Sequence, residues 1–484
     1  MNEEEKRLSA VDRAWLLMDR PSNPMTVLAL TIFDGRLKYS RLCEIIAQHF
    51  LAFERFRCRP VTDLMGGRWV EAEDFDLADH VLSVALPGEA GKRELEALAA
   101  ELASTPLSPD RPRWSFHLVE NYLGGSALIF RIHHCYADGI ALVRVYLSLT
   151  ESEPTAAHVR KGPARKTRPG AGAEAEAGES SDWFASLSSL YAPAASFLEK
   201  TAREGAHLVE RGLHYAMNPG EMATAIRDVA DVATEMARIG TLADEPATRL
   251  KHRASGVKHV AWGERLPFEE VRTISRVLAC TINDVITSTL AGALGRYLES
   301  QGDPVTGLVI RAAVPVNLRE ELSEPPTLGN QFGLVFVELP VGIRHPLERL
   351  YAVRAKMQAL KGSHQPLATL GLLATVGSLP AALEDPALAL FSAKASLVLS
   401  NVPGPRQKLY MGGVPISQLL FWVPQAGSIG VGVSVLTYHD QLQFGVIADR
   451  NLIPAPDELV RFMHAELERL VLLVLIGPGG SFAG

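Results

Sequence analysis

The sequence predicts a mixed α/β fold, of the α/β or α+β class, with two comparable lobes. Its 484 residues are too many for one ordinary hydrophobic core, so two or three domains are expected. Strand-like and helix-like apolar patterns alternate in a first block, residues 1–155, and again in a last block, residues 251–484. Between the blocks lie a low-complexity linker, residues 156–182, and a helical bridge, residues 183–250.

The first block begins with a helix and continues with strands. Ser9 followed three residues later by Asp12 is typical of a helix start. Uninterrupted apolar runs predict buried strands, and apolar residues at three- and four-residue steps predict helices. The predicted elements are a helix from residue 9, a strand at 26–33, a helix at 39–50, and a hairpin of strands at 114–120 and 127–133 with Gly124 and Gly125 in its turn.

The helical bridge and the last block follow the same two patterns. The bridge has helical apolar spacing up to about residue 244 and is broken at Asn218-Pro219-Gly220. We interpret its apolar stripe as core packing. In the last block we expect strands at 308–316, 334–339, 396–401, 430–438 and 443–448, and helices at 267–279, 284–298, 346–360 and 457–474.

Composition excludes several classes of protein. A net charge of -7 and an isoelectric point of about 6.1 argue against nucleic-acid binding, which needs a basic face. Four scattered cysteines predict reduced thiols and no disulfide framework or zinc site. The acidic start predicts no secretory signal. A mean hydropathy of +0.08 leaves room for an apolar tunnel or a membrane-facing patch.

Two segments have more than one interpretation. Residues 366–383 carry no charge but are broken by glycines and a proline, which predicts a core helix followed by a loop, with an interfacial segment as the alternative. Lysines and arginines crowd residues 160–168 of the linker. A solvated linker explains them, and attraction of CoA phosphates or an anionic membrane surface is the alternative.

The strongest functional signal is residues 133–139, His-His-Cys-Tyr-Ala-Asp-Gly. The segment follows an alternating apolar run and precedes an apolar helical run, which places the histidine pair on a sharp loop after a strand. A histidine there can act as a general base near neutral pH, because its unperturbed pKa is about 6.5.

The members of this motif also have structural interpretations. His133 fits a packed or hydrogen-bonded histidine, and Asp138 fits an N-cap for the helix that begins at Gly139. The glycine allows a tight turn or a close approach that a Cβ would block. Cys135 is a poor nucleophile here, because side chains of neighbouring residues in an extended segment point to opposite sides, and a base must be aimed at the thiol.

The motif and six further blocks resemble the bacterial wax ester synthase/diacylglycerol acyltransferase family, within the chloramphenicol acetyltransferase-like superfamily that also contains peptide-synthetase condensation domains. Arg113 departs from the family's Pro-Leu-Trp element. The blocks are residues 8–12 with 21–25, 112–114, 283–284, 314–319, 329–333 and 400–405.

The resemblance implies a catalytic role for the second histidine, His134. Its Nε2 would take the proton of an acceptor hydroxyl as that oxygen attacks the thioester carbonyl of acyl-CoA, and transfer would be direct. The resemblance casts Asp138 as structural, turned from the substrate and paired with an arginine, either Arg311 or Arg319. His133 would support the loop.

Two further residues complete the implied site. Gly139 would leave room for substrate. Asn283 would orient the site or help to hold the oxyanion, since a neutral amide donor suits a developing negative charge. Its alternative role is a cap for the helix that continues from Asp284.

The resemblance thus implies two chloramphenicol-acetyltransferase-like lobes with the active site in a channel between them. The expected activity is transfer of a long-chain acyl group from acyl-CoA to diacylglycerol, a long-chain alcohol, or both. We expect no cofactor and no metal, acyl-CoA being a co-substrate, and a cytoplasmic protein in peripheral contact with the inner membrane or lipid droplets. The alternatives are another acyltransferase with this motif, acting on carrier proteins or polyketides, and a non-catalytic lipid-binding protein.

Overall fold

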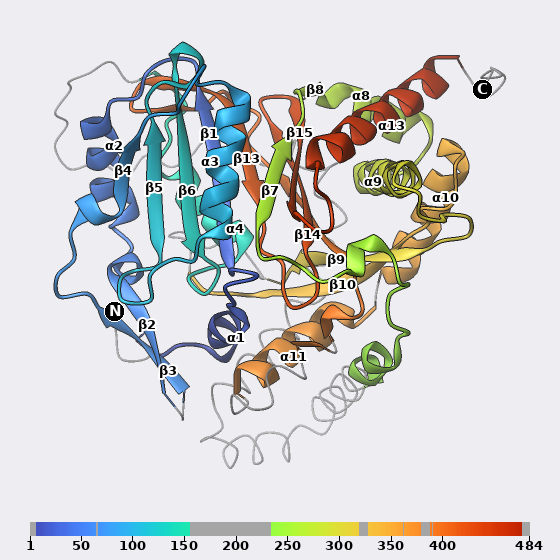
Figure 1. Ribbon diagram of the computed structural model, residues 1–484, viewed down its shortest axis with the longest axis horizontal. Helices are drawn as coiled ribbons and strands as arrows, with labels where there is room; N and C mark the ends of the chain where they lie inside the picture. The colour runs from blue at the N-terminus through green and yellow to red at the C-terminus, as the bar shows by residue number, and fades with distance from the viewer. Residues whose placement is uncertain are drawn as a thin grey trace, which may run out of the picture.

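The computed structural model describes residues 6–63, 66–154, 234–318, 328–361, 363–378, 388–389 and 391–476. It contains two large β-sheets side by side, with helices packed around them (Figure 1). The predicted mixed α/β class with two lobes is confirmed. The linker, residues 156–182, and the bridge up to residue 233 lie outside the described residues, and residues 234–241 of the bridge are helical.

The first sheet has six strands in the order β12-β13-β1-β6-β5-β4. Neighbouring strands are antiparallel except β4 and β5, which are parallel. The predicted hairpin of β5 and β6 is confirmed, and β1 has the predicted bounds. The strands are β1 Thr26–Phe33, β4 Val81–Val84, β5 Trp114–Val119, β6 Ser126–His133, β12 Tyr410–Met411 and β13 Val414–Trp422.

The second sheet has seven strands, six of them in the order β10-β9-β11-β14-β15-β7, with β8 paired to β15. All five predicted strands of the last block are present, while β7 and β8 were not predicted. The strands are β7 Lys258–Trp262, β8 Leu266–Pro267, β9 Ile310–Asn317, β10 Phe332–Leu339, β11 Leu397–Pro403, β14 Val431–Tyr438 and β15 Gln441–Asp449; a separate hairpin joins β2 Cys58–Asp63 and β3 Gly66–Glu71.

The division between the sheets does not follow the predicted division of the chain at residue 251. Strands β12 and β13 belong to the last block but complete the first sheet, where Trp422 of β13 lies opposite Leu28 of β1. The last block, residues 251–484, therefore supplies every strand of the second sheet and also two strands of the first. The physical reason is that β1 needs a second hydrogen-bonding neighbour, and β13 supplies it.

Helices cover both sheets. Helix α3 packs on the first sheet, with Leu95 and Ala99 in one buried cluster with Leu28 and Leu30 of β1 (Figure 1). The helices are α1 Ala10–Met18, α2 Tyr39–Ile45, α3 Lys92–Ser104, α4 Gly139–Leu147, α8 Phe268–Val277, α9 Ile282–Ser300, α10 Pro346–Leu360, α11 Gln365–Ser378 and α13 Pro456–Ile476, with a π-helical turn at Ile46–Phe50.

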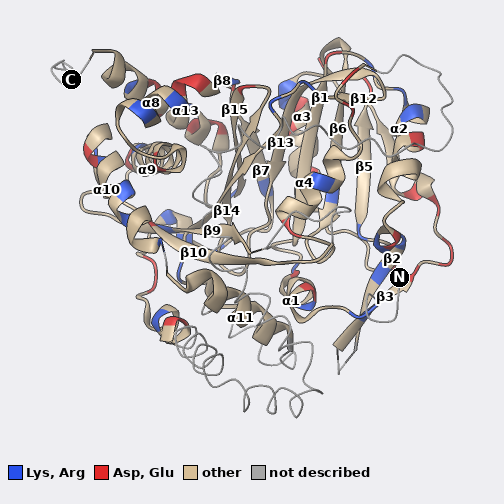
Figure 2. Cartoon of the chain, turned by 180° about the vertical axis from the view of Figure 1, so that it is seen from behind, with Lys and Arg blue, Asp and Glu red and all other residues tan. Residues whose placement is uncertain are grey.

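Helix α11 covers the described part of the uncharged segment, residues 366–383, for which a core helix and an interfacial segment were the two interpretations. Its residues Leu367, Ala368 and Leu373 are buried, and the helix packs against α1 and β10. It carries no charged residue, and the strands of both sheets are also largely uncharged (Figure 2). The core-helix interpretation is therefore confirmed over residues 365–378.

No single helix in the described ranges is long and apolar enough to cross a membrane. Helices α8 and α9 pass the same test of length and composition as a pair, but they are bent by 103° at the break between them.

Two glycines of α11 make a matched test of the contact between α11 and α1. A Cβ at Gly377 would overlap the carbonyl oxygen of Ala10, whereas a Cβ at Gly371 meets nothing within 4 Å. We expect Gly377→Ala to lower the free energy of unfolding by about 1–3 kcal/mol. Gly371→Ala should raise it by up to about 1 kcal/mol, because alanine favours the helix. Urea denaturation of both variants checks this, and equal changes would contradict the described packing.

Candidate active site

The motif loop lies where the ends of the two sheets approach each other. It begins at the last residue of β6, and its backbone is tied to both halves of the chain. The N–H of His134 donates to the carbonyl of Met25 before β1 at 2.8 Å, and the N–H of Asp138 donates to the carbonyl of Gly329 before β10 at 3.1 Å. The loop therefore bridges the segments that lead into the two sheets.

The imidazole of His134 is held by Asn330 and Asp12. The amide Nδ2 of Asn330 donates to Oδ1 of Asp12 at 2.8 Å and to the carbonyl of His134 at 2.9 Å. These two acceptors fix the amide so that its Oδ1 faces Nδ1 of His134, 2.9 Å away. Nδ1 must therefore carry the proton, and Nε2 keeps its lone pair. No hydrogen bond between described residues occupies Nε2.

Asp12 lies behind this pair and is itself buried. Its Oδ1 also accepts the backbone N–H of Asn330 at 3.2 Å, and its Oδ2 lies 3.9 Å from Nη1 of Arg55. Burial raises the pKa of Asp12, while the Arg55 guanidinium and the Asn330 hydrogen bonds act in the opposite direction. The carboxylate thus has partners on both sides, which a buried charge requires.

His134 is enclosed by aromatic rings. Trp15 stacks on the imidazole with ring centroids 4.1 Å apart, and Phe332 lies 5.6 Å away. This burial lowers the pKa of His134 to about 4, although Asp138 and Asn330 oppose the shift. The imidazole is therefore neutral near pH 7, which a proton acceptor requires.

His133 is held differently from its neighbour. Its Nδ1 accepts the N–H of Cys135 at 3.1 Å, so its Nε2 carries the proton and lies 3.4 Å from Oδ2 of Asp19. Asp19 also lies 3.4 Å from Nη1 of Arg113, the residue that departs from the family's element. Burial lowers the pKa of His133. Both ring nitrogens face protein groups, and the side chain supports the loop.

Asp138 caps the following helix. Its Oδ1 accepts the N–H of Ala141 at 3.0 Å, and its Oδ2 accepts the N–H of Gln331 at 3.0 Å. Of the two predicted arginine partners, Arg311 is wrong, because its guanidinium and backbone bind the carboxylate of Glu245 instead. Arg319 lies outside the described residues.

Neither Gly139 nor Asn283 takes part in the hydrogen bonds that the structure describes for His134. A Cβ at Gly139 would meet no heavy atom within 4 Å, so the space beside it is open, and its φ is not positive. The predicted cap role of Asn283 is wrong. Thr281 caps α9 and Asp284 completes the capping box, while Oδ1 of Asn283 accepts Nδ2 of Asn401 at 2.7 Å.

Cys135 is buried, and burial raises the pKa of its thiol well above the usual range. A protonated thiol is not a nucleophile. All four cysteines are free thiols. No cluster of His, Cys, Asp and Glu suited to a metal ion occurs among the residues that the structure describes.

Sequence reasoning missed the two residues that orient His134. Asn330 stands in the block 329–333 and Asp12 in the block 8–12, and both blocks carried the family resemblance without a role in the site for either residue. They lie 196 and 122 positions from His134 along the chain. One signal was available for Asn330: it lies in a loop-like block with a glycine at each end, and loops carry binding and catalytic residues more often than helices and strands do.

Comparisons with known proteins agree over almost the whole chain. Residues 8–286 match the wax ester synthase/diacylglycerol acyltransferase catalytic domain, and residues 328–471 match the WS/DGAT C-terminal domain. A Mycobacterium bovis protein named "Putative diacylglycerol O-acyltransferase" is 30% identical, over 98% of this chain and 92% of its own length.

Solved structures share the fold. A wax ester synthase/diacylglycerol acyltransferase from Marinobacter aquaeolei VT8 superposes with a TM-score of 0.66 at 21% identity, covering 97% of this chain and 99% of that one. The starter condensation domain of rhizomide synthetase, solved in complex with C8-CoA, superposes with a TM-score of 0.53 at 13% identity, covering 97% and 95%.

Proposed function

This chain belongs to the wax ester synthase/diacylglycerol acyltransferase family and is an acyltransferase, and on that basis we propose that it transfers a long-chain acyl group from acyl-CoA to a lipid hydroxyl, with His134 as the general base. The acceptor would be diacylglycerol, a long-chain alcohol, or both. The observation that carries the proposal is the arrangement of the Asn330 amide, whose oxygen faces Nδ1 of His134 because its Nδ2 donates to Asp12 and to the carbonyl of His134; Nε2 is then left as the proton acceptor.

The proposed reaction needs no covalent enzyme intermediate. Nε2 of His134 takes the proton from the acceptor hydroxyl while the hydroxyl oxygen forms a bond to the thioester carbonyl carbon. The tetrahedral intermediate then collapses, the carbon–sulfur bond breaks, and the thiolate of CoA takes the proton from the imidazolium. The products are the ester and CoA with a free thiol.

Asn330 and Asp12 would support this step by orientation and charge. When His134 gains a proton, its Nδ1–H···Oδ1 hydrogen bond to Asn330 becomes charge-assisted, and the Asp12 carboxylate lies one amide further on. This arrangement follows the general logic of a base oriented by a third group. In this proposal Asn330 and Asp12 are positioning residues.

The oxyanion of the intermediate needs a donor, and we propose Asn283. Its Oδ1 accepts from Asn401, which turns the amide so that Nδ2 remains a donor. No hydrogen bond joins Asn283 to His134 in the described part of the chain. Gly139, with open space beside it, would admit the reacting group.

The proposed acceptors are insoluble in water, so we propose peripheral contact with a membrane or lipid droplet surface on the cytoplasmic side. Apolar side chains at the end of α13, Leu475 and Ile476, are 73% and 55% exposed. Flotation of the full chain with vesicles measures this contact, and a protein that stays at the bottom of the gradient would contradict it.

The first prediction from this mechanism concerns the product of the reaction and the general base. Incubation with palmitoyl-CoA and either hexadecanol or dioleoylglycerol should give the corresponding ester, identified by mass spectrometry, with release of CoA. His134→Ala should lower the rate by roughly 10²–10⁴-fold, the usual contribution of general base catalysis. His439→Ala is the control, because His439 is exposed. Unchanged CoA release by the His134 variant would remove the histidine from the mechanism.

The second prediction tests Asn330 as a positioning residue. Asn330→Ala should lower kcat by about 10²-fold and leave the KM for acyl-CoA nearly unchanged, because the base loses its orientation and not its substrate. Asn121→Ala is the matched control, since it removes two hydrogen bonds to Leu86, of 2.8 and 2.9 Å, near the opposite end of β6. A rise in KM with constant kcat would argue for a binding role.

The third prediction concerns pH. The buried His134 has its pKa lowered to about 4, so the neutral base persists as pH falls and is lost only near that value. Activity should therefore show no loss near pH 6.5. The same shift makes the stability of the fold depend on pH. In the unfolded chain this histidine binds a proton at about pH 6.5, whereas in the folded protein it binds one only near pH 4, so the free energy of unfolding should fall as the pH drops from about 6.5 towards 4. Initial rates, measured at pH values where the protein remains folded, check the prediction for activity, and an acid midpoint of the rate near pH 6.5 would refute it.

A further inference from the structure

A cavity of about 640 Å³ lies between α9, the loop before α10 and α13. It is on the side of the second sheet away from α4 and the first sheet (Figure 1), and its lining does not include His134 or any residue that contacts it. Four arginines line it, Arg296, Arg344, Arg349 and Arg469. Nothing in the proposed acyl transfer uses this cavity.

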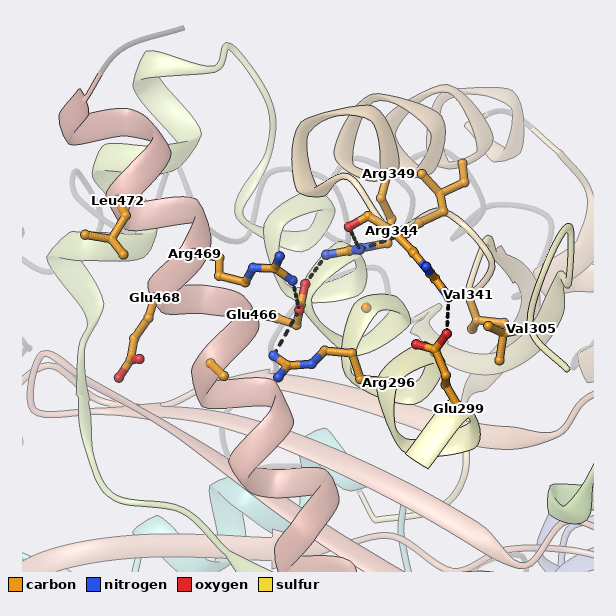
Figure 3. A pocket seen from close by; sticks show the side chains of 14 residues that line it. Arg296, Glu299, Val305, Val341, Arg344, Arg349, Glu466, Glu468, Arg469 and Leu472 are labelled. Atoms are coloured by element: carbon orange, nitrogen blue, oxygen red, sulfur yellow. Dashed lines mark hydrogen bonds and ion pairs between the residues drawn. The ribbon is translucent and has the colours of Figure 1, made fainter. Parts of the chain in front are cut away.

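Three of these arginines converge on one carboxylate. Glu466 of α13 is fully buried, and Arg349 forms a buried ion pair with its Oε2. Nη1 of Arg296 lies 3.4 Å from Oε1 of the same carboxylate, and Nη1 of Arg469 lies 3.0 Å from it (Figure 3). Three positive charges around one negative charge leave an excess of two.

The other charges at the cavity reduce this excess to one but leave it positive. Arg344 and Glu299 form an ion pair, which is neutral. Glu468 also lines the cavity and adds one negative charge, although its side chain lies on the other side of α13 from the three arginines (Figure 3). The pKa of Arg349 is lowered chiefly by burial; Glu466 opposes this lowering, and the charges of Arg469 and Arg296 add to it. One carboxylate is thus shared among three guanidinium groups.

Two glycines of α9 allow the neighbouring groups of the cavity to lie close to this helix. A Cβ at Gly292 would overlap the Arg349 guanidinium and the Glu466 carboxylate, and a Cβ at Gly295 would overlap the carbonyl oxygen of Val341. The arginine of α9 itself, Arg296, packs its guanidinium 4.9 Å from the ring of Phe462. The floor of the cavity is thus formed by residues in fixed positions.

The two outer arginines remain accessible from the cavity. The side chains of Arg296 and Arg469 are 40% and 51% exposed, and each has several N–H donors beyond the one that faces Glu466. Apolar side chains complete the lining, Val305 and Val341 on one side of the arginines and Leu472 of α13 on the other (Figure 3). The cavity therefore offers convergent guanidinium donors with apolar side chains on either side of them.

We propose that this cavity binds an organic phosphate, with the phosphate group held by Arg296 and Arg469. Guanidinium groups match the geometry of phosphate oxygens, and a phosphate would supply the negative charge that the cavity lacks. The volume falls in the range of small-molecule sites and exceeds what a bare phosphate fills, so the organic part would lie against the apolar side chains of the lining.

Two sources could supply this chemistry, a soluble nucleotide or the headgroup of an anionic phospholipid. The lipid source is worth testing because α13 continues beyond the cavity to the exposed side chains of Leu475 and Ile476. In both cases the same two guanidinium groups would bind the phosphate.

The test measures binding to the full chain in the absence of acyl substrates. Because ADP is also a part of CoA, only binding that depends on Arg296 and Arg469 is assigned to this cavity, and this dependence separates the result from the acyl transfer proposal. The soluble probe is ADP, followed by isothermal titration calorimetry. The lipid probe is vesicles of phosphatidylcholine with or without phosphatidylglycerol, followed by co-sedimentation. The variant is the double substitution Arg296→Gln and Arg469→Gln, which leaves the buried Arg349–Glu466 pair in place.

The control is Arg41→Gln in α2, because Arg41 is 41% exposed and has a similar contact of 2.9 Å to Glu44. Circular dichroism verifies that each variant is folded. We expect the wild type to bind ADP or to prefer phosphatidylglycerol vesicles, and the double variant to bind that probe at least about tenfold more weakly. The Arg41 variant should bind like the wild type.

The arms of the experiment identify the source. Arginine-dependent binding of ADP alone points to a soluble organic phosphate, and arginine-dependent binding of phosphatidylglycerol vesicles alone points to a lipid headgroup. The proposal is overturned if the wild type binds neither probe at millimolar concentration, or if the double variant binds as tightly as the wild type.

Discussion

The hydrogen bonds from Asp12 through Asn330 to His134 are the interaction on which the candidate site depends. They connect the first helix, the start of the second sheet and the loop after β6, so one amide side chain joins three segments that are far apart in sequence. Burial makes these bonds strong and also makes them obligatory, because any unpaired member would be costly at this depth. The same burial keeps the imidazole neutral.

Two neighbouring histidines consequently have opposite protonation patterns. His134 carries its proton on Nδ1, facing an amide oxygen, while His133 accepts a backbone N–H at Nδ1 and carries its proton on Nε2, facing Asp19. Different partners decide this difference, because the N–H of Cys135 donates to Nδ1 of His133, whereas the amide oxygen of Asn330 faces Nδ1 of His134. A pair that looks symmetrical in the sequence is therefore asymmetrical in chemistry.

The sequence predicted the elements whose apolar pattern is local and continuous. The eight apolar or β-branched residues of β1 and the strand before the histidines needed no tertiary information, and both were located correctly. Strands β7 and β13 were missed, because β7 is short and begins with Lys258, and β13 contains Pro415. What makes them strands is a partner strand elsewhere in the chain.

The site shows the same division. The position of His134 on a loop after a strand follows from its neighbours along the chain. Asn330 could not be assigned, because its role exists only when the second sheet meets the first. Asn283 was also misjudged as a possible cap, since the hydroxyl of Thr281 and the carboxylate of Asp284 together start α9 two residues earlier.

The membership of β12 and β13 in the first sheet has a consequence for how the chain folds. About 380 residues separate β1 from its neighbour β13, as in the hydrogen bond from Ser417 Oγ to the carbonyl of Ile32, 385 positions away. During synthesis, β1 leaves the ribosome long before β13 exists, so its edge stays unpaired for most of translation. High contact order of this kind slows folding and prolongs the exposure of an aggregation-prone edge. The two lobes are therefore expected to reach the native state together and late, with the first sheet closing only after nearly the whole chain has been made.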